Sequence, residues 1–298
     1  MESSRLPRFQ RAASVASIQL TQRDREIIWL VHRHRFLRSS HICPLMGGSS
    51  QQLLRRLKLL YHHGFLERPR AQIDYYHRGG SQLMVYGLGS RGVASLKQEL
   101  GAAFQDRSWG GDDRGAGRMF LQHELLVADV MVAIELACRE RGIRLFTEDR
   151  LQSGIRRFRW KVKVRGGGRL SVIPDRVFAL EFPDQKGNRA CFFLEADRGT
   201  MPVMRKNLSQ TSFYRKLLAY EATWSQAIHR SRFGFHRFRV LTITTNSERV
   251  KHLIDACRTL ESGRGLFLFT DISSLRHPDF LSLPWQTTRP GITATLFD

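Results

Sequence analysis

The chain has 298 residues, 42% of them hydrophobic, so it is long enough for two domains with their own cores and is not expected to be disordered throughout. Its 48 Lys and Arg outweigh 27 Asp and Glu and give a formal net charge of +21. This excess is mostly arginine and is spread over amphipathic segments, which predicts a polyanionic partner and favours nucleic acid over a membrane surface.

Nothing in the sequence predicts a membrane span or a secretory signal. The longest apolar run, LLVADVMVAIELAC, is interrupted by Asp129 and Glu135 and stays below the roughly 20 residues that a transmembrane helix needs. Residues 1–19 carry arginines and serines without a long apolar core, so they are predicted to form a flexible basic arm. The four cysteines form no Cys-x-x-Cys pair, which indicates reduced thiols in a cytoplasmic protein.

A first domain is predicted over residues 20–100. Apolar residues recur at helical spacing from Thr21 to Phe36, and Thr21 with Asp24 forms a capping start. A short helix follows in SSHICPLMGGSS and is closed by Gly47 and Gly48. A third helix is capped by Ser49 or Ser50 and ends at Gly64.

The third helix has the pattern of a DNA-recognition helix, because a leucine stripe would hold it to the domain while its opposite face meets the groove. The residues of that polar face are Gln51, Gln52, Arg55, Arg56 and Lys58. A protein-interaction domain with a solvated basic face is the competing interpretation, and the high net charge favours DNA.

A β-hairpin is predicted after this helix, with a turn at Arg78-Gly79-Gly80 and a second strand, QLMVYGL, that leads into another helix. Three helices and a hairpin make a winged helix-turn-helix, and Arg78 at the turn is a further candidate DNA contact. The phrases HHGFLER and VYGLGSRGV resemble the winged helix-turn-helix of many bacterial DNA-binding proteins.

Residues 101–118, rich in Gly, Asp and Arg, are predicted to be a linker to a second domain over residues 119–298. Periodicity predicts that this domain is a mixed α/β sheet flanked by helices. The expected helices are Met119–Gly142, Val203 to about His229, and Glu248–Leu260. The expected strands are Ile143–Thr147, Phe158–Val164, Leu170–Leu180, Ala190–Glu195, Phe238–Thr244 and Gly265–Phe269.

Two neighbouring strands of this sheet each present acidic residues: Asp175 after Pro174 on one, and Glu195 with Asp197 on the other. Carboxylates that converge at one edge of a sheet can hold Mg²⁺ or Mn²⁺, which activates water and stabilises a phosphate in cleavage. The alternative is structural: Asp175 as a turn residue, and Glu195 in an ion pair with Arg198.

The order of elements, with Pro-Asp on one strand and Glu-Ala-Asp on the next, resembles the PD-(D/E)XK nuclease superfamily, whose fold is a restriction-endonuclease-like mixed sheet. Asp197 stands where that superfamily has its catalytic lysine. The resemblance implies a site of Asp175, Glu195 and Asp197, with the lysine's role moved to Lys206 or Lys216 or with catalysis lost. It also implies Glu124 as an added metal ligand.

A further cationic surface is predicted in RRFRWKVKVRGGGR, where basic and apolar residues alternate as in an amphipathic strand. Arg157, Arg159 and Lys161 are its candidate DNA contacts, and Trp160 is expected in the core. A solvated strand face is the alternative interpretation.

The winged helix, IPDRVFAL, FFLEADRGT, YRKLLAYEATW and FRVLTITTNSERVKHL together resemble the replication-relaxation family of plasmids and integrative elements. In that family the Glu-x-Asp-Arg-Gly-Thr phrase is characteristic, so the resemblance makes Asp197 a family feature. It implies a bacterial protein that binds double-stranded DNA in the replication or transfer of a mobile element, with other proteins of that element as further partners.

Three functions remain open at this point. The first is a metal-dependent endonuclease or nickase directed by the winged helix. The second is a catalytically inactive regulator or assembly factor with a degenerate nuclease fold, a role in which dimerisation stays open. A relaxase with Tyr214 or Tyr220 as nucleophile ranks lowest, because the histidine triad of such enzymes is missing.

Overall fold

The computed structural model describes residues 8–12, 17–75, 83–101, 117–151, 158–164, 168–184, 187–207 and 209–298, with the backbone alone at residues 74 and 75. The chain divides into two compact units, Met1–Val132 and Ala133–Asp298. The predicted turn at Arg78-Gly79-Gly80 and residues 102–116 of the predicted linker lie outside the described residues. None of the helices in the described ranges combines the length and the apolar character needed to span a bilayer.

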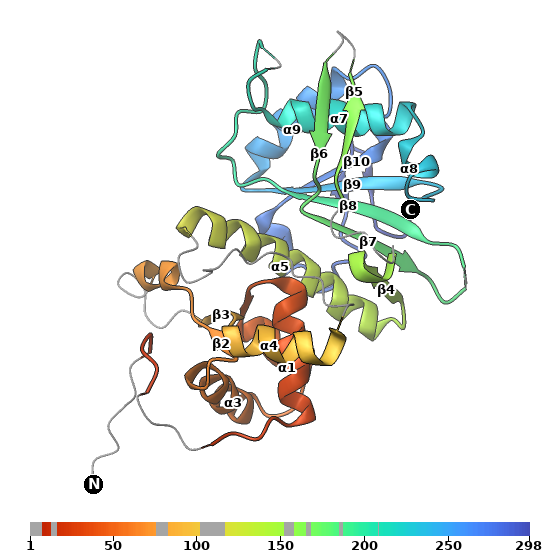
Figure 1. Cartoon of the computed structure of the whole chain (residues 1–298). Helices are drawn as coiled ribbons and strands as arrows, with labels where there is room; N and C mark the ends of the chain where they lie inside the picture. The colour runs from red at the N-terminus through yellow and green to blue at the C-terminus, as the bar shows by residue number, and fades with distance from the viewer. Residues whose placement is uncertain are drawn as a thin grey trace. The chain divides into compact units, whose positions relative to one another are not determined.

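The first unit contains helices and three short antiparallel strands, which carry the warm colours of Figure 1. The helices are α1 (Gln22–His34), α2 (Ser39–Met46), α3 (Ser50–His62), α4 (Ser90–Leu100) and α5 (Arg118–Glu140), whose last residues belong to the second unit. The strands, in the sheet order β1-β3-β2, are β1 (Leu37–Arg38), β2 (Leu66–Glu67) and β3 (Val85–Leu88).

The first two long helices begin as predicted. Thr21 N donates to Asp24 Oδ2 at 2.7 Å and Asp24 N donates to Thr21 Oγ1 at 3.3 Å, so a capping box starts α1. At the start of α3, Ser49 Oγ accepts from Gln52 N at 3.4 Å. Leu53, Leu57 and Leu60 of the predicted leucine stripe of α3 are buried, but Leu54, also assigned to that stripe, is exposed.

The strand expected after Gly64 is much shorter than predicted. It ends at Glu67 and is followed by a 3-10 helix, η1 (Arg70–Tyr75), because Pro69 cannot donate a hydrogen bond to a sheet. The Gln72 side chain takes the place of a neighbouring strand: its amide donates to Val85 O at 3.0 Å and accepts from Val85 N at 2.8 Å. The strand β1 was not predicted.

Two glycines of the VYGLGSRG segment lie where a side chain would clash with the backbone. A Cβ at Gly89 would lie 2.3 Å from the carbonyl oxygen of Gly64, and one at Gly92 would lie 2.3 Å from the carbonyl oxygen of Phe65. The turn into α4 therefore needs glycine for close backbone approach.

The second unit is a mixed sheet with helices, and the predicted mixed α/β class is confirmed. Its helices are α6 (Glu148–Leu151), α7 (Phe213–Ser225), α8 (Ile228–Ser231), α9 (Ser247–Arg258) and the 3-10 segments η4 (Arg264–Leu266) and η5 (Ile272–Arg276). Its strands are β4 (Arg144–Thr147), β5 (Trp160–Lys163), β6 (Arg169–Val172), β7 (Arg176–Glu181), β8 (Ala190–Ala196), β9 (Phe238–Thr244), β10 (Phe267–Asp271), β11 (Trp285–Gln286) and β12 (Thr293–Ala294).

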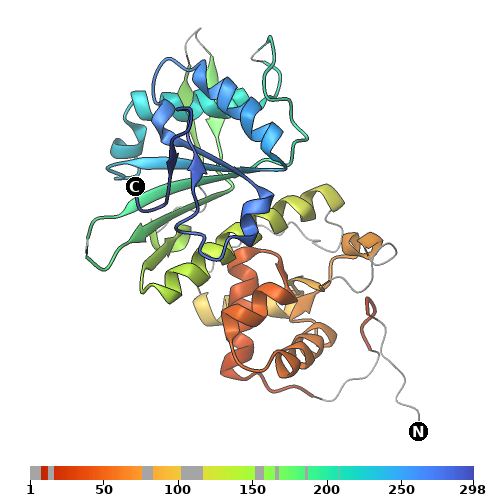
Figure 2. The ribbon, with the colours of Figure 1, turned by 180° about the vertical axis from the view of Figure 1, so that it is seen from behind.

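Seven of these strands form one sheet in the order β12-β11-β10-β9-β8-β7-β4. The pairs β8–β9 and β9–β10 are parallel, and the others are antiparallel. Figure 1 shows α7 and α9 over one face of this sheet and the separate β5–β6 hairpin beside α7. Figure 2 shows the last strands, in dark blue, at one side of the sheet.

Two expectations for this unit were wrong in detail, and two of its strands were missed. The strand predicted over Leu170–Leu180 is broken into β6 and β7, because Pro174 fixes its own φ and lacks an N–H. The helix predicted from Val203 begins only at Phe213, since Ser209 N donates to Asn207 Oδ1 at 2.8 Å in a local turn that competes with helix. The strands β11 and β12 were not predicted.

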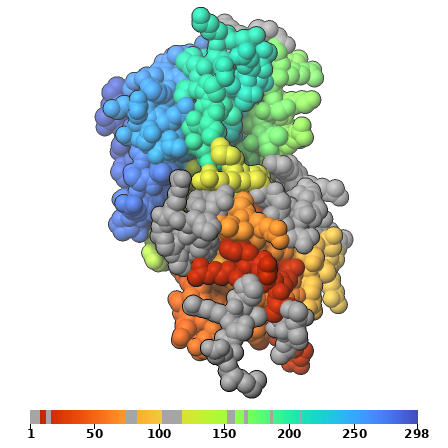
Figure 3. Space-filling view, turned by 90° about the vertical axis from the view of Figure 1, so that its left-hand side faces the viewer, coloured from red at the N-terminus to blue at the C-terminus, as the bar shows by residue number. Residues whose placement is uncertain are grey.

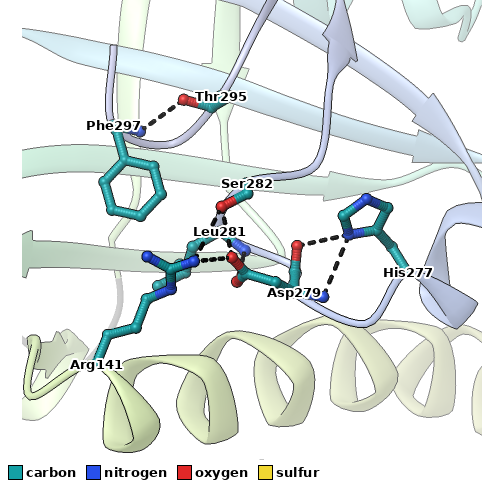
Figure 4. A network of polar contacts seen from close by, with 7 residues as sticks. All are labelled: Arg141, His277, Asp279, Leu281, Ser282, Thr295 and Phe297. Carbon is teal, nitrogen blue, oxygen red and sulfur yellow. Dashed lines mark hydrogen bonds and ion pairs between the residues drawn. The ribbon is translucent and has the colours of Figure 1, made fainter.

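A polar network fixes the C-terminal segment within the second unit (Figure 4). The Arg141 guanidinium pairs with the Asp279 carboxylate and lies 5.3 Å from the centre of the Phe297 ring. Asp279 Oδ1 also accepts from Leu281 N at 3.1 Å. These contacts hold the end of the chain against the turn that follows α5.

Candidate functional site

Two of the predicted acidic residues meet at one edge of the large sheet. Strand β7 pairs with β8 in the register Arg176↔Leu194, so Asp175, just before β7, lies next to Glu195, near the end of β8. Asp175 Oδ2 accepts from Ala196 N at 2.8 Å, and Asp175 N donates to Leu194 O at 3.1 Å. The predicted convergence of these two carboxylates is therefore present.

Glu195 is almost completely buried, and α7 supplies a donor to each of its oxygens. Tyr220 donates its hydroxyl to Glu195 Oε1 at 2.5 Å, and the Lys216 ammonium lies 2.5 Å from Oε2. Lys216 and Tyr220 are four residues apart, so they project from the same face of the helix. Of the two lysines predicted for this site, Lys216 is the one that reaches it.

The charges of this cluster are strongly coupled. Burial raises the pKa of the Glu195 carboxyl, and the nearby Asp175 adds to that rise, which Lys216 partly offsets. Burial alone would lower the pKa of Lys216, but the carboxylates of Glu195 and Asp175 outweigh it and raise that pKa, so the lysine stays charged. Burial together with Glu195 raises the pKa of Tyr220, so its phenol remains a donor and does not fit the role of a nucleophile.

Asp197 is buried in a network of its own. Its carboxylate accepts from Thr244 Oγ1 at 2.7 Å and from Arg249 Nε at 2.8 Å and NH2 at 3.2 Å. Sequence reasoning missed Arg249, which lies 52 residues away on α9. The third negative charge at the position of the superfamily's lysine is thus paired with a guanidinium, which also donates to Met201 O at 2.5 Å.

Two other predicted site residues lie elsewhere. Lys206 is exposed in the segment between β8 and α7, which is teal in Figure 3, and it precedes the helix that was expected to carry it. Glu124 belongs to the first unit, where its Oε1 lies 3.5 Å from the Arg35 guanidinium.

The donor set does not fit a preformed site for Mg²⁺ or Mn²⁺. Both Glu195 oxygens face donors from α7, and both Asp197 oxygens face Arg249. In the part of the chain that the structure describes, no three His, Cys, Asp or Glu side chains are grouped to hold a metal ion. A cation would have to displace Lys216 from Glu195 before it could bind there.

The predicted DNA-contact residues of α3 differ in their exposure and partners. Gln51, Gln52, Arg55 and Lys58 are exposed on the face opposite the buried leucines. Arg56 instead points back into the first unit, where its guanidinium donates to the buried Asp24 carboxylate at 2.6 and 2.5 Å. Arg56 therefore has a structural partner that the helical pattern did not reveal.

The hairpin β5–β6 alternates as predicted. Trp160 and Val162 are buried while Lys161 and Lys163 are exposed, and Arg159 just before the strand is exposed too. Trp160 donates to Thr223 Oγ1 on α7 at 2.8 Å, which confirms its place in the core. Arg157 and Arg78 lie outside the described residues.

Comparison with known proteins gives one finding. A family model described as Replication-relaxation matches residues 29–237, which include α3, β7, β8 and α7. No curated protein and no solved structure matches the chain significantly.

Proposed function

Because the chain belongs to the Replication-relaxation family, we propose that it binds double-stranded DNA through the exposed face of α3. The observation that carries this proposal is the arrangement of α3, in which Leu53, Leu57 and Leu60 are buried while Gln51, Gln52, Arg55 and Lys58 face solvent. Such a helix can be held by its domain and still enter a major groove.

Two further observations support duplex DNA as the partner. The helices α1 to α3, followed by β2 and β3, have the order of a winged helix-turn-helix, and this assignment is part of the proposal. The formal net charge of +21 would draw the chain to any phosphate backbone. The family membership suggests a protein associated with plasmid replication, and other replication or transfer proteins of the element are proposed as partners.

The second unit is proposed to be a PD-(D/E)XK-like domain that now acts as a binding module. The support is the pairing of β7 with β8 and the place of α7 directly after them. Lys216 and Tyr220 hold Glu195, and Arg249 holds Asp197, which stabilises the cluster without a metal. In this role the domain contributes cationic surface, including Arg159 and Lys161 on the hairpin.

Metal-dependent nicking of DNA is the second candidate function. It is favoured by the meeting of Asp175, Glu195 and Lys216, which are the acidic pair and the displaced lysine of such nucleases. Incubation of supercoiled plasmid with Mg²⁺ or Mn²⁺ tests it: nicking by the wild type that Glu195→Gln abolishes would support this candidate. Absence of nicking, or equal nicking by Glu195→Gln, would exclude it.

The test of duplex binding compares two variants by fluorescence anisotropy at fixed salt. Arg55→Ala combined with Lys58→Ala is expected to weaken binding by roughly tenfold or more, since two contacts to phosphates or bases are lost. Lys251→Ala, which removes an exposed cation from α9, is the matched control and should change affinity little. Equal affinities for the α3 variant and the wild type would refute the proposed surface.

A further inference from the structure

A cavity of about 770 Å³ lies at the starts of β8 and β9 and at the approach to β10. Glu195 lies near the other end of β8, and β8 and β9 run parallel. A strand of seven residues spans about 20 Å, so the cavity and the Asp175–Glu195 cluster are at opposite edges of the sheet. The cavity is therefore a separate site.

The wall of the cavity is cationic. Four arginines line it, Arg189, Arg237, Arg239 and Arg264, against one acidic side chain, that of Asp298. Asp298 uses its carboxylate to accept from Thr295 N at 2.6 Å and from Thr295 Oγ1 at 2.9 Å. An anionic ligand would meet a lining in which positive side chains predominate.

The arginines differ in how far they are already engaged. Arg189 lies 3.6 Å from Glu181, and Arg239 donates to Asp298 O at 3.2 Å. Arg264 uses only its Nε, which donates to Leu260 O at 2.7 Å. Arg237 is exposed and has no polar partner among the described residues, so it is the side chain most available to a phosphate.

Aromatic rings lie beside these cations. Trp224 is half-buried and stacks on His229 with ring centres 4.9 Å apart and planes 8° from parallel. Phe297 is 42% exposed, and Arg141 lies over its ring (Figure 4). Phe297 is also in tilted contact with Phe182, with ring centres 5.5 Å apart. Trp224 and Phe297 both line the cavity, so a base that entered it would meet aromatic surface.

We propose that this cavity binds single-stranded DNA, with Arg237 and Arg264 on its phosphates and Trp224 and Phe297 against its bases. A cavity of about 770 Å³ has the size of a small-ligand site, which suits one or two nucleotides of a single strand and is too small for a double helix. Arginines interleaved with aromatic faces are the pattern by which proteins hold unpaired strands without sequence preference. This inference extends DNA binding beyond the duplex surface on α3 and uses none of its residues.

The experiment measures the affinity of the full chain for labelled oligothymidylate and for a duplex in the same buffer. Arg237→Glu and Phe297→Ala are expected to weaken oligothymidylate binding, Phe297→Ala by roughly fivefold to 150-fold, the range for one lost base stack. Both variants should leave duplex binding within about twofold. Lys251→Glu is the matched charge reversal outside the cavity and should affect neither ligand strongly.

Three outcomes would overturn the inference: equal losses in Lys251→Glu and Arg237→Glu, a parallel loss of duplex and single strand in both cavity variants, or thymidine triphosphate binding as tightly as the oligomer. The last would make the cavity a site for free nucleotides. The α3 variant with Arg55→Ala and Lys58→Ala should lose duplex binding and keep single-strand binding. Failure of the duplex proposal can therefore be told apart from failure of the cavity proposal.

Discussion

Two buried carboxylates, one in each unit, have similar hydrogen-bond partners, but their pKa values are shifted in opposite directions. Asp24 is fully buried, and Arg56 donates to both of its oxygens. Glu195 is 1% exposed, and Lys216 and Tyr220 donate to its oxygens. Burial would raise the pKa of Asp24, but hydrogen bonds from Arg56 and Thr21 outweigh it and lower that pKa, whereas the pKa of Glu195 is raised.

The difference arises first from burial, which is the main cause of the raised Glu195 pKa, and then from a second carboxylate. Asp24 has donors alone around it, while Glu195 has Asp175 close enough to oppose its charge. Asp24 is thus a structural anchor between α1 and α3, whereas the Glu195 cluster, with its perturbed pKa values, is proposed as a functional site.

The largest effect is expected from Asp24→Asn. An asparagine keeps the cap on α1 but leaves the Arg56 guanidinium without its carboxylate, so unfolding free energy should fall by about 3 kcal/mol. Urea denaturation measures this. Asp255→Asn is the matched control, because its pair with Arg258 is exposed and is worth at most about 1 kcal/mol. Equal losses of unfolding free energy in the two variants would show that Asp24 is not a structural anchor.

A much smaller effect is expected from Glu195→Gln. The raised pKa means that the folded chain disfavours the charge of Glu195 relative to the unfolded chain. The Asp175 carboxylate also remains near Lys216 as a counter-charge, so a neutral amide of the same size should be tolerated. Urea denaturation at neutral pH should give a stability within about 1 kcal/mol of the wild type. A loss as large as that of Asp24→Asn would show that the two carboxylates serve the same structural purpose.

The pH dependence of these differences should have opposite signs. The contribution of Asp24 is present above its ordinary pKa of 3.8 and is lost as pH falls through its lowered folded pKa, so the advantage of wild type over Asp24→Asn shrinks in acid. The contribution of Glu195 is present below 4.5 and is lost as pH rises through its raised pKa. The unfolding free energy of the wild type should therefore fall relative to that of Glu195→Gln as pH rises above 4.5. Stability curves of parallel slope would contradict the assigned directions.

Local patterns predicted much of the architecture. Residues only a few positions apart along the chain determine three of the features that were predicted: the Thr21 capping box, the buried leucines of α3 and the alternation around Trp160. The meeting of Asp175 and Glu195 could also be predicted, because adjacent antiparallel strands bring the start of one beside the end of the other.

Long-range partners could not be predicted in the same way. Arg56 has the spacing of a groove-facing residue, and only the fold shows that its guanidinium donates to the Asp24 carboxylate. Arg249 neutralises Asp197 from another helix, and nothing near Asp197 in the sequence points to it. The strands β1, β11 and β12 have two residues each, which is too short for an alternating pattern to appear.

Duplex affinity of the wild-type chain, measured in EDTA across a series of salt concentrations, tests the central claim most directly. The chain is expected to bind without a divalent metal, and the logarithm of its affinity should fall linearly with the logarithm of the salt concentration, by about 0.9 for each phosphate contacted. Binding that appears only with Mg²⁺, or no duplex binding at low salt, would contradict it.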